Sequence, residues 1–282
     1  MKNIIDLSNY QLESKGLFFN HRSTVKIGDD IYYLKDYDDP IELIVCEFCH
    51  LLDIPCVDYQ IAKKDDKFYL ISKSFRQKGC KYIKGGDLID DFLIHSKKSD
   101  LRKLHMANFK NGTKNNLETI WLSLASKYSK DKSKYADIRS VMVSLLKQYF
   151  LMIMIQDADF HRYNWEIEES DNHISLSPKF DNASAFNDME IWGVPMGVSV
   201  DDPFRTSVES LEYFLSITDI EDINLFLDLF YKATPEVLQE AINIVKEKYE
   251  IDDPFFYDKL MDCYINHRKE IYEVLITKGL IR

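Results

Sequence analysis

The residues of this chain best suited to chemistry lie near its middle, where an apolar stretch runs into a cluster of polar side chains. Asp159, His161 and Asn164 form a D-x-H-x-x-N pattern, and Asp181 follows about one hairpin later. Phosphoryl transfer needs a carboxylate that orients the attacking hydroxyl and oxygen ligands that hold Mg²⁺ against the phosphates. These residues supply both. The alternative is a polar loop whose Asp and Asn side chains cap local turns.

The same chemistry requires a cation that contacts the nucleotide phosphates and is itself held in place. Lys35 is expected to end a strand, and Glu42 lies one turn into the helix predicted after it. A strand lysine paired with a helix glutamate is the arrangement that kinases use for this contact. Glu47 competes with Glu42 for the role. In the simplest alternative, Lys35 caps an edge strand and Glu42 faces solvent.

Two further segments are expected to surround a nucleotide. The loop before the first hairpin, which includes Ser23 and Thr24, would cover the phosphates. It lacks the glycines that let backbone N–H groups approach a ligand, which leaves open a damped or conditionally active enzyme. Residues 70–75, with Ser72 and Ser74, are expected to form a hinge whose backbone meets an adenine edge. An ordinary strand end is the alternative for this second segment.

Hydrophobic and turn patterns predict the elements that must position these side chains. β-Branched and aromatic residues flank the two-residue turn Gly28-Asp29, which is a hairpin signal. Pro40 then precedes an apolar helical pattern. The predicted elements of this first part are strands over 25–27 and 30–34, a helix over 41–52, and strands over 57–62 and 67–73.

After the glycines at 79, 85 and 86 the pattern becomes helical, with apolar residues at three- and four-residue spacing. Thr234-Pro235-Glu236 marks a helix start, with an N-cap hydroxyl followed by a proline. The predicted elements are helices over 88–95, 116–127 and 138–155, short strands around 164–167 and 174–176, and further helices from residue 207 to the C-terminus. The chain is therefore expected to have an α+β fold.

Several ordered blocks of this sequence resemble the HipA-type toxin kinase family, a branch of the protein-kinase-like fold. The blocks are Tyr32-Tyr33-Leu34-Lys35, Glu42 followed by Asp53-Ile54-Pro55, Ser72-Lys73-Ser74-Phe75, Asp159–Asn164 and Leu176–Asp181. The last block resembles the family's L-x-P-x-(Y/F)-D magnesium segment. The resemblance implies a two-lobed α+β fold, with a small β-rich N-lobe over residues 1–80 and a larger, mostly helical C-lobe over residues 81–282.

The resemblance also implies roles for individual residues. Asp159 would be the catalytic base, and His161 would brace the catalytic loop. Asn164 and Asp181 would bind Mg²⁺, and Lys35 would contact ATP. The implied activity is that of a bacterial, cytoplasmic serine/threonine kinase that uses ATP and Mg²⁺.

Partners follow from the same resemblance. The implied substrate is a protein, including the kinase itself, with Ser23 or Thr24 as the candidate autophosphorylation site. The family's longest members carry an additional subdomain before the nucleotide hairpin, so this chain resembles the shorter form. Short forms can work with a separately encoded antitoxin or partner subunit, as in a toxin–antitoxin pair.

Two other functions stay open on the sequence. Phosphoinositide-type lipid kinases and small-molecule kinases share the D-x-H-x-x-N arrangement, and no residue identifies the phosphate acceptor. A third hypothesis is a pseudokinase that uses its lobes to bind a partner. The missing glycine-rich loop favours the pseudokinase, whereas the intact lysine, base and metal-ligand set opposes it.

Composition limits the partners and the location of the protein. A formal net charge of −11 argues against broad nucleic-acid binding, although residues 95–134 carry ten Lys or Arg against three Asp or Glu. A solvated face is the favoured interpretation of this segment, and a docking patch for an acidic partner such as RNA is the alternative. The longest apolar run, Tyr149–Ile155, is too short to span a membrane, and the N-terminus has no signal-peptide pattern.

The cysteines point to a reducing compartment, because five is an odd number and no disulfide framework is evident. Cys46 and Cys49 form a C-x-x-C pattern followed by His50, which is compatible with half of a metal site. No second cysteine pair stands at zinc-site spacing, and the segment has a helical pattern. Buried helical thiols are therefore the favoured interpretation.

Overall fold

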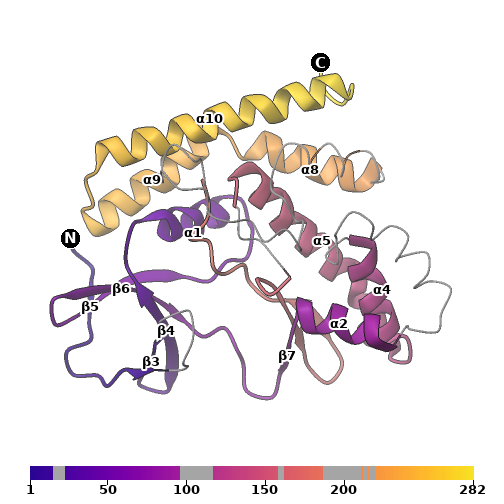
Figure 1. Ribbon diagram of the computed structural model, residues 1–282, viewed down its shortest axis with the longest axis horizontal. Helices are drawn as coiled ribbons and strands as arrows, with labels where there is room; N and C mark the ends of the chain where they lie inside the picture. Colours follow the sequence, from indigo (N-terminus) through magenta and orange to yellow (C-terminus); the bar gives the residue numbers. More distant parts are fainter. Residues whose placement is uncertain (15–22, 96–116, 158–161, 187–210, 212–214, 216–219) are drawn as a thin grey trace. The chain divides into compact units, whose positions relative to one another are not determined.

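The computed structural model describes residues 1–14, 23–95, 117–157, 162–186, 211, 215 and 220–282, which form two compact units. Unit 1 comprises Met1–Arg76 and Lys232–Met261, and unit 2 comprises Gln77–Tyr231 and Asp262–Arg282. Unit 1 contains a large sheet, and unit 2 is mostly helical (Figure 1). The predicted α+β class is confirmed. The lobe boundary expected at residue 80 stays a prediction.

Unit 1 is built on a six-stranded sheet with the strand order β1-β5-β6-β4-β3-β2. Its elements are β1 Ile5–Asp6, β2 Glu13–Ser14, β3 Ser23–Ile27, β4 Asp30–Asp36, α1 Ile41–Leu51, β5 Tyr59–Lys64, β6 Lys67–Lys73 and α9 Pro235–Tyr249. The predicted hairpin is confirmed, since Ile27 pairs with Asp30 across a two-residue turn. Gly28 opens that turn with φ +62°, a value that glycine adopts without steric cost. The sequence patterns did not predict the short strands β1 and β2.

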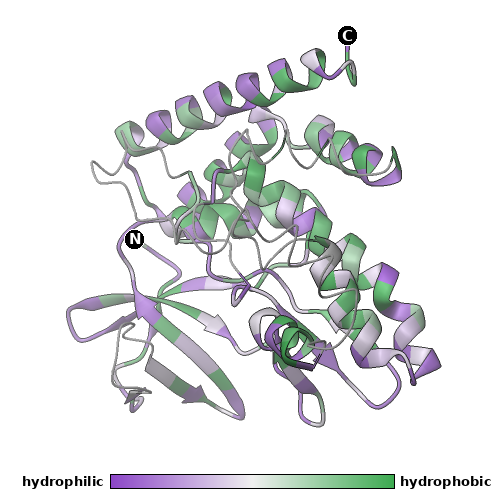
Figure 2. Ribbon diagram, turned by 45° about the vertical axis from the view of Figure 1, so that its right-hand side comes forward, coloured by the Kyte–Doolittle hydropathy of each residue, from purple (hydrophilic) through white to green (hydrophobic). Residues whose placement is uncertain are grey.

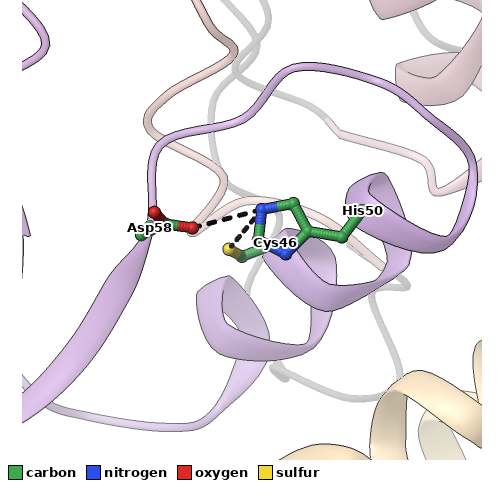
Figure 3. A group of neighbouring side chains, drawn as sticks. All are labelled: Cys46, His50 and Asp58. Atoms are coloured by element: carbon green, nitrogen blue, oxygen red, sulfur yellow. Dashed lines mark hydrogen bonds and ion pairs between the residues drawn. The ribbon is translucent and has the colours of Figure 1, made fainter.

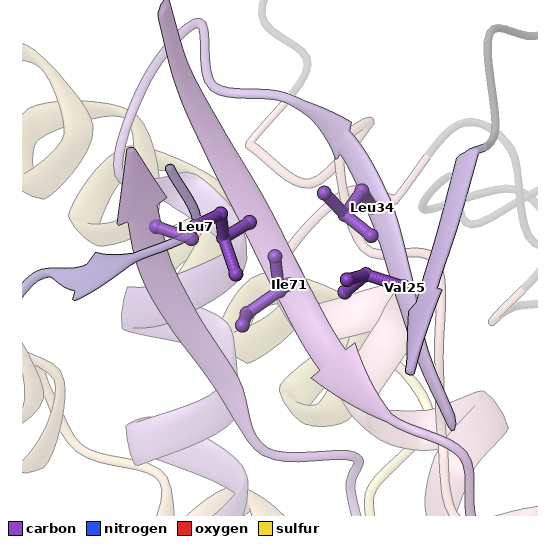
Figure 4. Packing of buried hydrophobic residues seen from close by; sticks show 5 residues of the cluster. Leu7, Val25, Leu34 and Ile71 are labelled. Atoms are coloured by element: carbon purple, nitrogen blue, oxygen red, sulfur yellow. The ribbon is translucent and has the colours of Figure 1, made fainter. Parts of the chain in front are cut away.

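The core of unit 1 lies against the sheet, where side chains from four strands and the N-terminal segment meet (Figure 4). The fully buried members of this cluster are Leu7, Val25, Leu34, Ala62 and Ile71. Helix α1 is buried over most of its circumference because it contacts both β5 and α9. A helix this apolar on all sides is stable only when it is covered by neighbours. Helix α9, from the C-terminal part of the chain, is therefore a structural member of unit 1.

Unit 2 combines a three-stranded sheet, in the order β7-β8-β9, with helices. Its elements are β7 Lys81–Lys84, α2 Gly85–His95, α4 Leu117–Tyr128, α5 Lys132–Met154, β8 Glu166–Glu169, β9 Ile174–Leu176 and α8 Ile220–Lys232, and α10 Pro254–Thr277 runs from unit 1 into unit 2. Hydrophobic and hydrophilic residues alternate along most helical ribbons, as expected for helices with one buried face (Figure 2). The strand β7 was not predicted.

Helix α5 begins six residues before the predicted position, because Asp131 caps it. The Asp131 carboxylate accepts hydrogen bonds from the backbone N–H groups of Ser133 and Lys134. Lys134, from the basic segment, is nearly buried and pairs with Glu169 of β8 at 2.9 Å. At least this lysine therefore belongs to the fold of unit 2 and not to a solvated face.

Helix α9 begins at Pro235 as predicted, and Thr234 takes the extended N-cap conformation, but its hydroxyl forms no capping hydrogen bond.

Among the described residues, none of the helices combines the length and the apolar character that a membrane crossing requires.

Candidate active site

The nucleotide-contacting lysine expected from the sequence lies in β4, and its partner lies on α1. Lys35 forms an ion pair with Glu42, whose side chain is almost completely buried. Glu47, the competing partner, instead lies 3.4 Å from Lys248 of α9. A buried carboxylate requires a cation or several hydrogen bonds, so Lys35 is held where it is by the fold of unit 1.

The start of α1 concentrates negative charge near Lys35. Asp39 accepts a hydrogen bond from the backbone N–H of Ile41 at 2.8 Å. Burial and the nearby Glu42 charge raise the pKa of Asp39 to about 6, against the opposing effects of the Ile41 hydrogen bond and Lys35. The lysine amine also lies 5.7 Å from the centroid of the Tyr59 ring. Lys35 thus faces a carboxylate-rich helix start and one aromatic ring.

Ser23 and Thr24 lie in β3 and not in the loop to which the sequence assigned them. They pair with β2 on one side and with β4 on the other. The Thr24 side chain is buried, and its hydroxyl donates to the Glu13 carbonyl at 3.5 Å. The loop assignment is wrong for these two residues because the β3–β4 pairing continues past Val25 to Ser23, and the unpredicted strand β2 pairs with them on the other side. The preceding residues of that loop lie outside the described part of the chain.

Strand β6 ends within the segment expected to form the hinge, so part of this segment is strand and the rest follows it. Ser72 belongs to β6, where it pairs with Tyr33 on one side and with Tyr59 on the other. Ser74 follows the strand, and its backbone N–H donates to Ile31 at 2.8 Å. Ser72 has a strand partner on both sides, whereas Lys73 pairs only with Tyr32 of β4, so backbone groups facing away from β4 are left without a strand partner from Lys73 onward.

In unit 2, the β8–β9 hairpin positions the two expected metal ligands. Asn164 lies two residues before β8, and Asp181 lies five residues after β9. At the end of the hairpin opposite the turn, the Ser177 N–H donates a hydrogen bond to the Glu166 carbonyl at 2.9 Å. Antiparallel pairing therefore brings the start of β8 and the end of β9 to the same end of the hairpin. Asn164 is buried, whereas Asp181 is partly exposed.

A buried ion pair that the sequence reasoning missed supports the Asp181 segment. Lys179 and Asp157 are both fully buried, and the lysine amine lies 3.7 Å from the carboxylate. The amine also donates to the backbone carbonyls of Phe180 at 2.6 Å and Asp181 at 3.3 Å. Asp181 takes a left-handed conformation with φ +61°, which these bonds help to hold. No local pattern in the sequence signals this pair, because its members are 22 residues apart.

Helix α2 packs against the backbone around Asn164 through two glycines. The Gly85 N–H donates to the Trp165 carbonyl at 3.0 Å, and the Gly86 N–H donates to the Arg162 carbonyl at 2.7 Å. A Cβ at Gly85 would lie 2.2 Å from the Trp165 ring, and one at Gly86 would lie 2.3 Å from the Tyr163 ring. Only glycine allows this approach without displacement.

An ion pair reinforces the same contact, since Arg162 lies 2.9 Å from Asp90 of α2. The chain on both sides of the D-x-H-x-x-N pattern is thus anchored, by Asp157 before it and by residues 162–165 after it. Asp159 and His161 themselves lie outside the residues that the structure describes. The catalytic, nucleotide and metal roles of all these residues stay predictions.

The fold has known counterparts, although the sequence matches no family model and no curated protein. The structure is similar to the crystal structure of the Helicobacter pylori proinflammatory kinase CtkA, with a TM-score of 0.66 and 12% identity over 98% of both chains. It is also similar to HipA from the Shewanella oneidensis HipA–HipB complex with operator DNA, with a TM-score of 0.55 and 13% identity. That match covers 86% of this chain and 58% of the HipA chain. The chain has a protein-kinase-like fold.

Proposed function

We propose that this protein is an ATP- and Mg²⁺-dependent serine/threonine protein kinase of HipA type that can phosphorylate itself. The observation that carries the proposal is the ion pair between Lys35 and the buried Glu42, found in a chain with a protein-kinase-like fold. In kinases this pair places the amine for contact with the nucleotide phosphates. A lysine that merely capped an edge strand would not require a buried carboxylate.

The residues available in unit 2 fit a magnesium ion by their chemistry. Asn164 offers an amide oxygen and Asp181 a carboxylate, and hard cations prefer such oxygen ligands. When bound, Mg²⁺ neutralises charge on the phosphates. The buried lysine beside Asp181 binds backbone carbonyls and so restrains the segment that carries this carboxylate.

The remaining steps belong to the chain's own side chains. Asp159 accepts or orients the proton of the attacking hydroxyl, and His161 braces the loop that carries it. Lys35 holds the α- and β-phosphates through its ammonium group. The substrate hydroxyl belongs to a protein, with Ser23 as the more accessible candidate on this chain, because Thr24 is buried.

A separately encoded partner is part of the proposal. The similar HipA structure was solved with HipB and operator DNA, which supports an antitoxin-type protein as the partner. Binding of nucleic acid by this chain itself is not proposed, because its formal net charge is −11.

The decisive experiment incubates purified protein with labelled ATP and Mg²⁺ and locates transferred phosphate by mass spectrometry. Lys35→Met, Asp159→Asn and Asp181→Asn should each lower transfer by at least about 100-fold. Lys26→Met on the neighbouring strand and Asp171→Asn in the β8–β9 turn are matched surface controls that should retain transfer. Transfer that survives all three site variants would overturn the assignment.

The pseudokinase hypothesis is tested in the same preparation. The phosphate-covering loop has no glycine, which is the one observation that favours it. A pseudokinase would show a nucleotide-dependent rise in unfolding temperature without any transfer to itself or to added proteins. If lipid or small-molecule extracts accept phosphate and proteins do not, the acceptor class proposed here is wrong but the kinase assignment stands.

A further inference from the structure

Outside the candidate active site, a second cluster of chemically competent side chains lies at the end of α1. Cys46 and His50 are four residues apart and so lie on the same side of the helix. The Cys46 Sγ lies 3.9 Å from His50 Nε2, and the same nitrogen lies 3.2 Å from the Asp58 carboxylate. Figure 3 shows the three side chains converging, and their ligand atoms lie within 4.8 Å of one another.

The loop after α1 explains how Asp58 reaches this place. Asp53 takes a left-handed conformation with φ +55°, which reverses the chain at the helix end. The Ile54 N–H then donates to the Cys49 carbonyl at 2.9 Å. Residues 56–58 consequently run back along the helix toward β5 and bring new side chains beside Cys46.

Cys56, on the returning segment, lies outside this group of three. The pKa of Cys46 is raised, first by a side-chain hydrogen bond with Cys56 and then by burial. The backbone N–H of Tyr59 also donates to the Cys46 sulfur, and this contact lowers the pKa. Cys49 of the C-x-x-C pattern is buried and is not a member of the group.

A carboxylate lies on the far side of the imidazole. Glu47 Oε2 is 3.5 Å from His50 Nδ1, while Nε2 faces Cys46 and Asp58. Histidines that bind metals almost always donate their second ring N–H to such a group, which fixes the tautomer and raises the basicity of the ligand. Glu47 is itself 3.4 Å from Lys248. The histidine therefore has the second-sphere partner that a metal ligand needs.

We propose that Cys46, His50 and Asp58 bind one Zn²⁺ ion that joins the end of α1 to the start of β5, with the fourth tetrahedral position open to water. With zinc–sulfur distances of about 2.3 Å and zinc–nitrogen or zinc–oxygen distances of about 2.0 Å, tetrahedral ligand atoms lie roughly 3.3–3.6 Å apart. The separations of 3.9 Å and 3.2 Å are close to these values. A thiolate and an imidazole select zinc over Mg²⁺ or Ca²⁺.

The exposed His50 and Asp58 side chains give a zinc ion access to the site from solvent. Cys46 is buried, but the His50 and Asp58 side chains are 42% and 76% exposed. Binding requires the Cys46 thiol to lose its proton, so the affinity for zinc must fall as the pH is lowered. The bound ion would hold α1, which also carries Glu42, against the loop that leads to β5. Zinc binding itself is independent of the proposed kinase activity.

The test measures zinc and cobalt binding to the full chain after removal of metals by a chelator, without nucleotide. We expect one Zn²⁺ per chain by calorimetry and elemental analysis, and an increase in the unfolding temperature at saturation. Co²⁺ should give the visible bands of a tetrahedral site together with a near-ultraviolet thiolate band. Millimolar Mg²⁺ should not compete.

Variants identify the ligands. His50→Ala and Cys46→Ala should lower the zinc affinity by at least about 100-fold, and Glu47→Gln by about 10- to 100-fold. Cys49→Ala, on the same helix, is the matched control and should retain full affinity. His50 is exposed, so its variant keeps the test valid if Cys46→Ala fails to fold. Absence of stoichiometric binding, or unchanged binding in His50→Ala, would overturn the proposal and leave a hydrogen-bonded cluster without metal.

Discussion

Lys179 is a fully buried cation whose charge is balanced by the fully buried Asp157 carboxylate 3.7 Å away. Removing one member of a buried pair leaves an uncompensated charge in a medium that solvates it poorly. Lys179→Met is therefore expected to lower the free energy of unfolding by about 3–5 kcal/mol, measured by urea denaturation. The double variant Lys179→Met/Asp157→Asn should be more stable than the single one. A loss below about 1 kcal/mol would show that the pair carries no such charge.

His267 of α10 is buried beside the end of α5. Its Nε2 donates to the Ile153 carbonyl at 2.7 Å, and its Nδ1 lies 2.9 Å from the Gln156 amide nitrogen and 3.4 Å from Glu270. Burial lowers the pKa of His267 below its usual 6.5, although hydrogen bonds to the Ile153 carbonyl and the Glu270 carboxylate oppose this shift. The neutral imidazole is therefore the form that the fold accommodates.

A pH dependence of stability follows from this residue. The folded state binds fewer protons than the unfolded state once the pH falls below about 6.5, so stability decreases as the pH is lowered further. Measured unfolding free energies should show this decrease between pH 7 and pH 5 in the wild type. His267→Gln, which can still donate to Ile153, should show a smaller one. Identical pH profiles would exclude His267 as the source.

At the scale of elements, the contact between α2 and the segment before β8 depends on two glycines. Neither glycine is needed for an unusual φ, so each acts by the space that it leaves. Gly85 faces the Trp165 ring, which is fully buried, whereas Gly86 faces the Tyr163 ring, which is 38% exposed. The tyrosine has room to move, and the tryptophan does not.

Gly85→Ala and Gly86→Ala form a matched pair that measures this difference. We expect Gly85→Ala to destabilise unit 2 by about 2 kcal/mol or more, because overpacking displaces a buried ring. Gly86→Ala should cost less than about 1 kcal/mol, since alanine favours the helix by a similar amount. Thermal and urea unfolding provide the measurement. Equal effects would mean that the Trp165 side of the contact is as adaptable as the Tyr163 side.

At the scale of the whole molecule, unit 1 is built from two distant parts of the chain. Helix α1 contacts α9, and the Lys2 N–H donates to the Tyr249 carbonyl at 3.0 Å. Lys248 reaches Glu47 on α1. The sheet and α1 alone would expose the apolar face that α9 covers.

A fragment ending at Arg76 should therefore fail to fold cooperatively, although it contains the whole six-stranded sheet. Circular dichroism during thermal unfolding would show a broad, non-cooperative change, because the buried side chains of α1 lose their cover. The full chain, measured in parallel, is the control. A sharp transition in the fragment would show that α9 is dispensable for this unit.

The sequence alone determined the local features, because they depend on neighbouring residues. The Gly28-Asp29 hairpin and the helix after Pro40 follow from turn chemistry and hydrophobic period. The same patterns anticipated the strands on either side of the β8–β9 turn. The pairing of Lys35 with Glu42 was foreseeable because kinases combine these residue types in this order.

Tertiary structure decided what depends on contacts between distant residues. Strand β2 is two residues long and exists only through pairing with β3. Ser23 and Thr24 were misplaced in a loop because their polar side chains hide their pairing with β2 and β4. The burial of Lys179 beside Asp157 joins positions 22 residues apart, and no local pattern encodes it. The convergence of Cys46, His50 and Asp58 likewise required the chain reversal at Asp53. Short-range periodicity in the sequence cannot predict such long-range contacts, because they depend on loop closure and on packing against other elements.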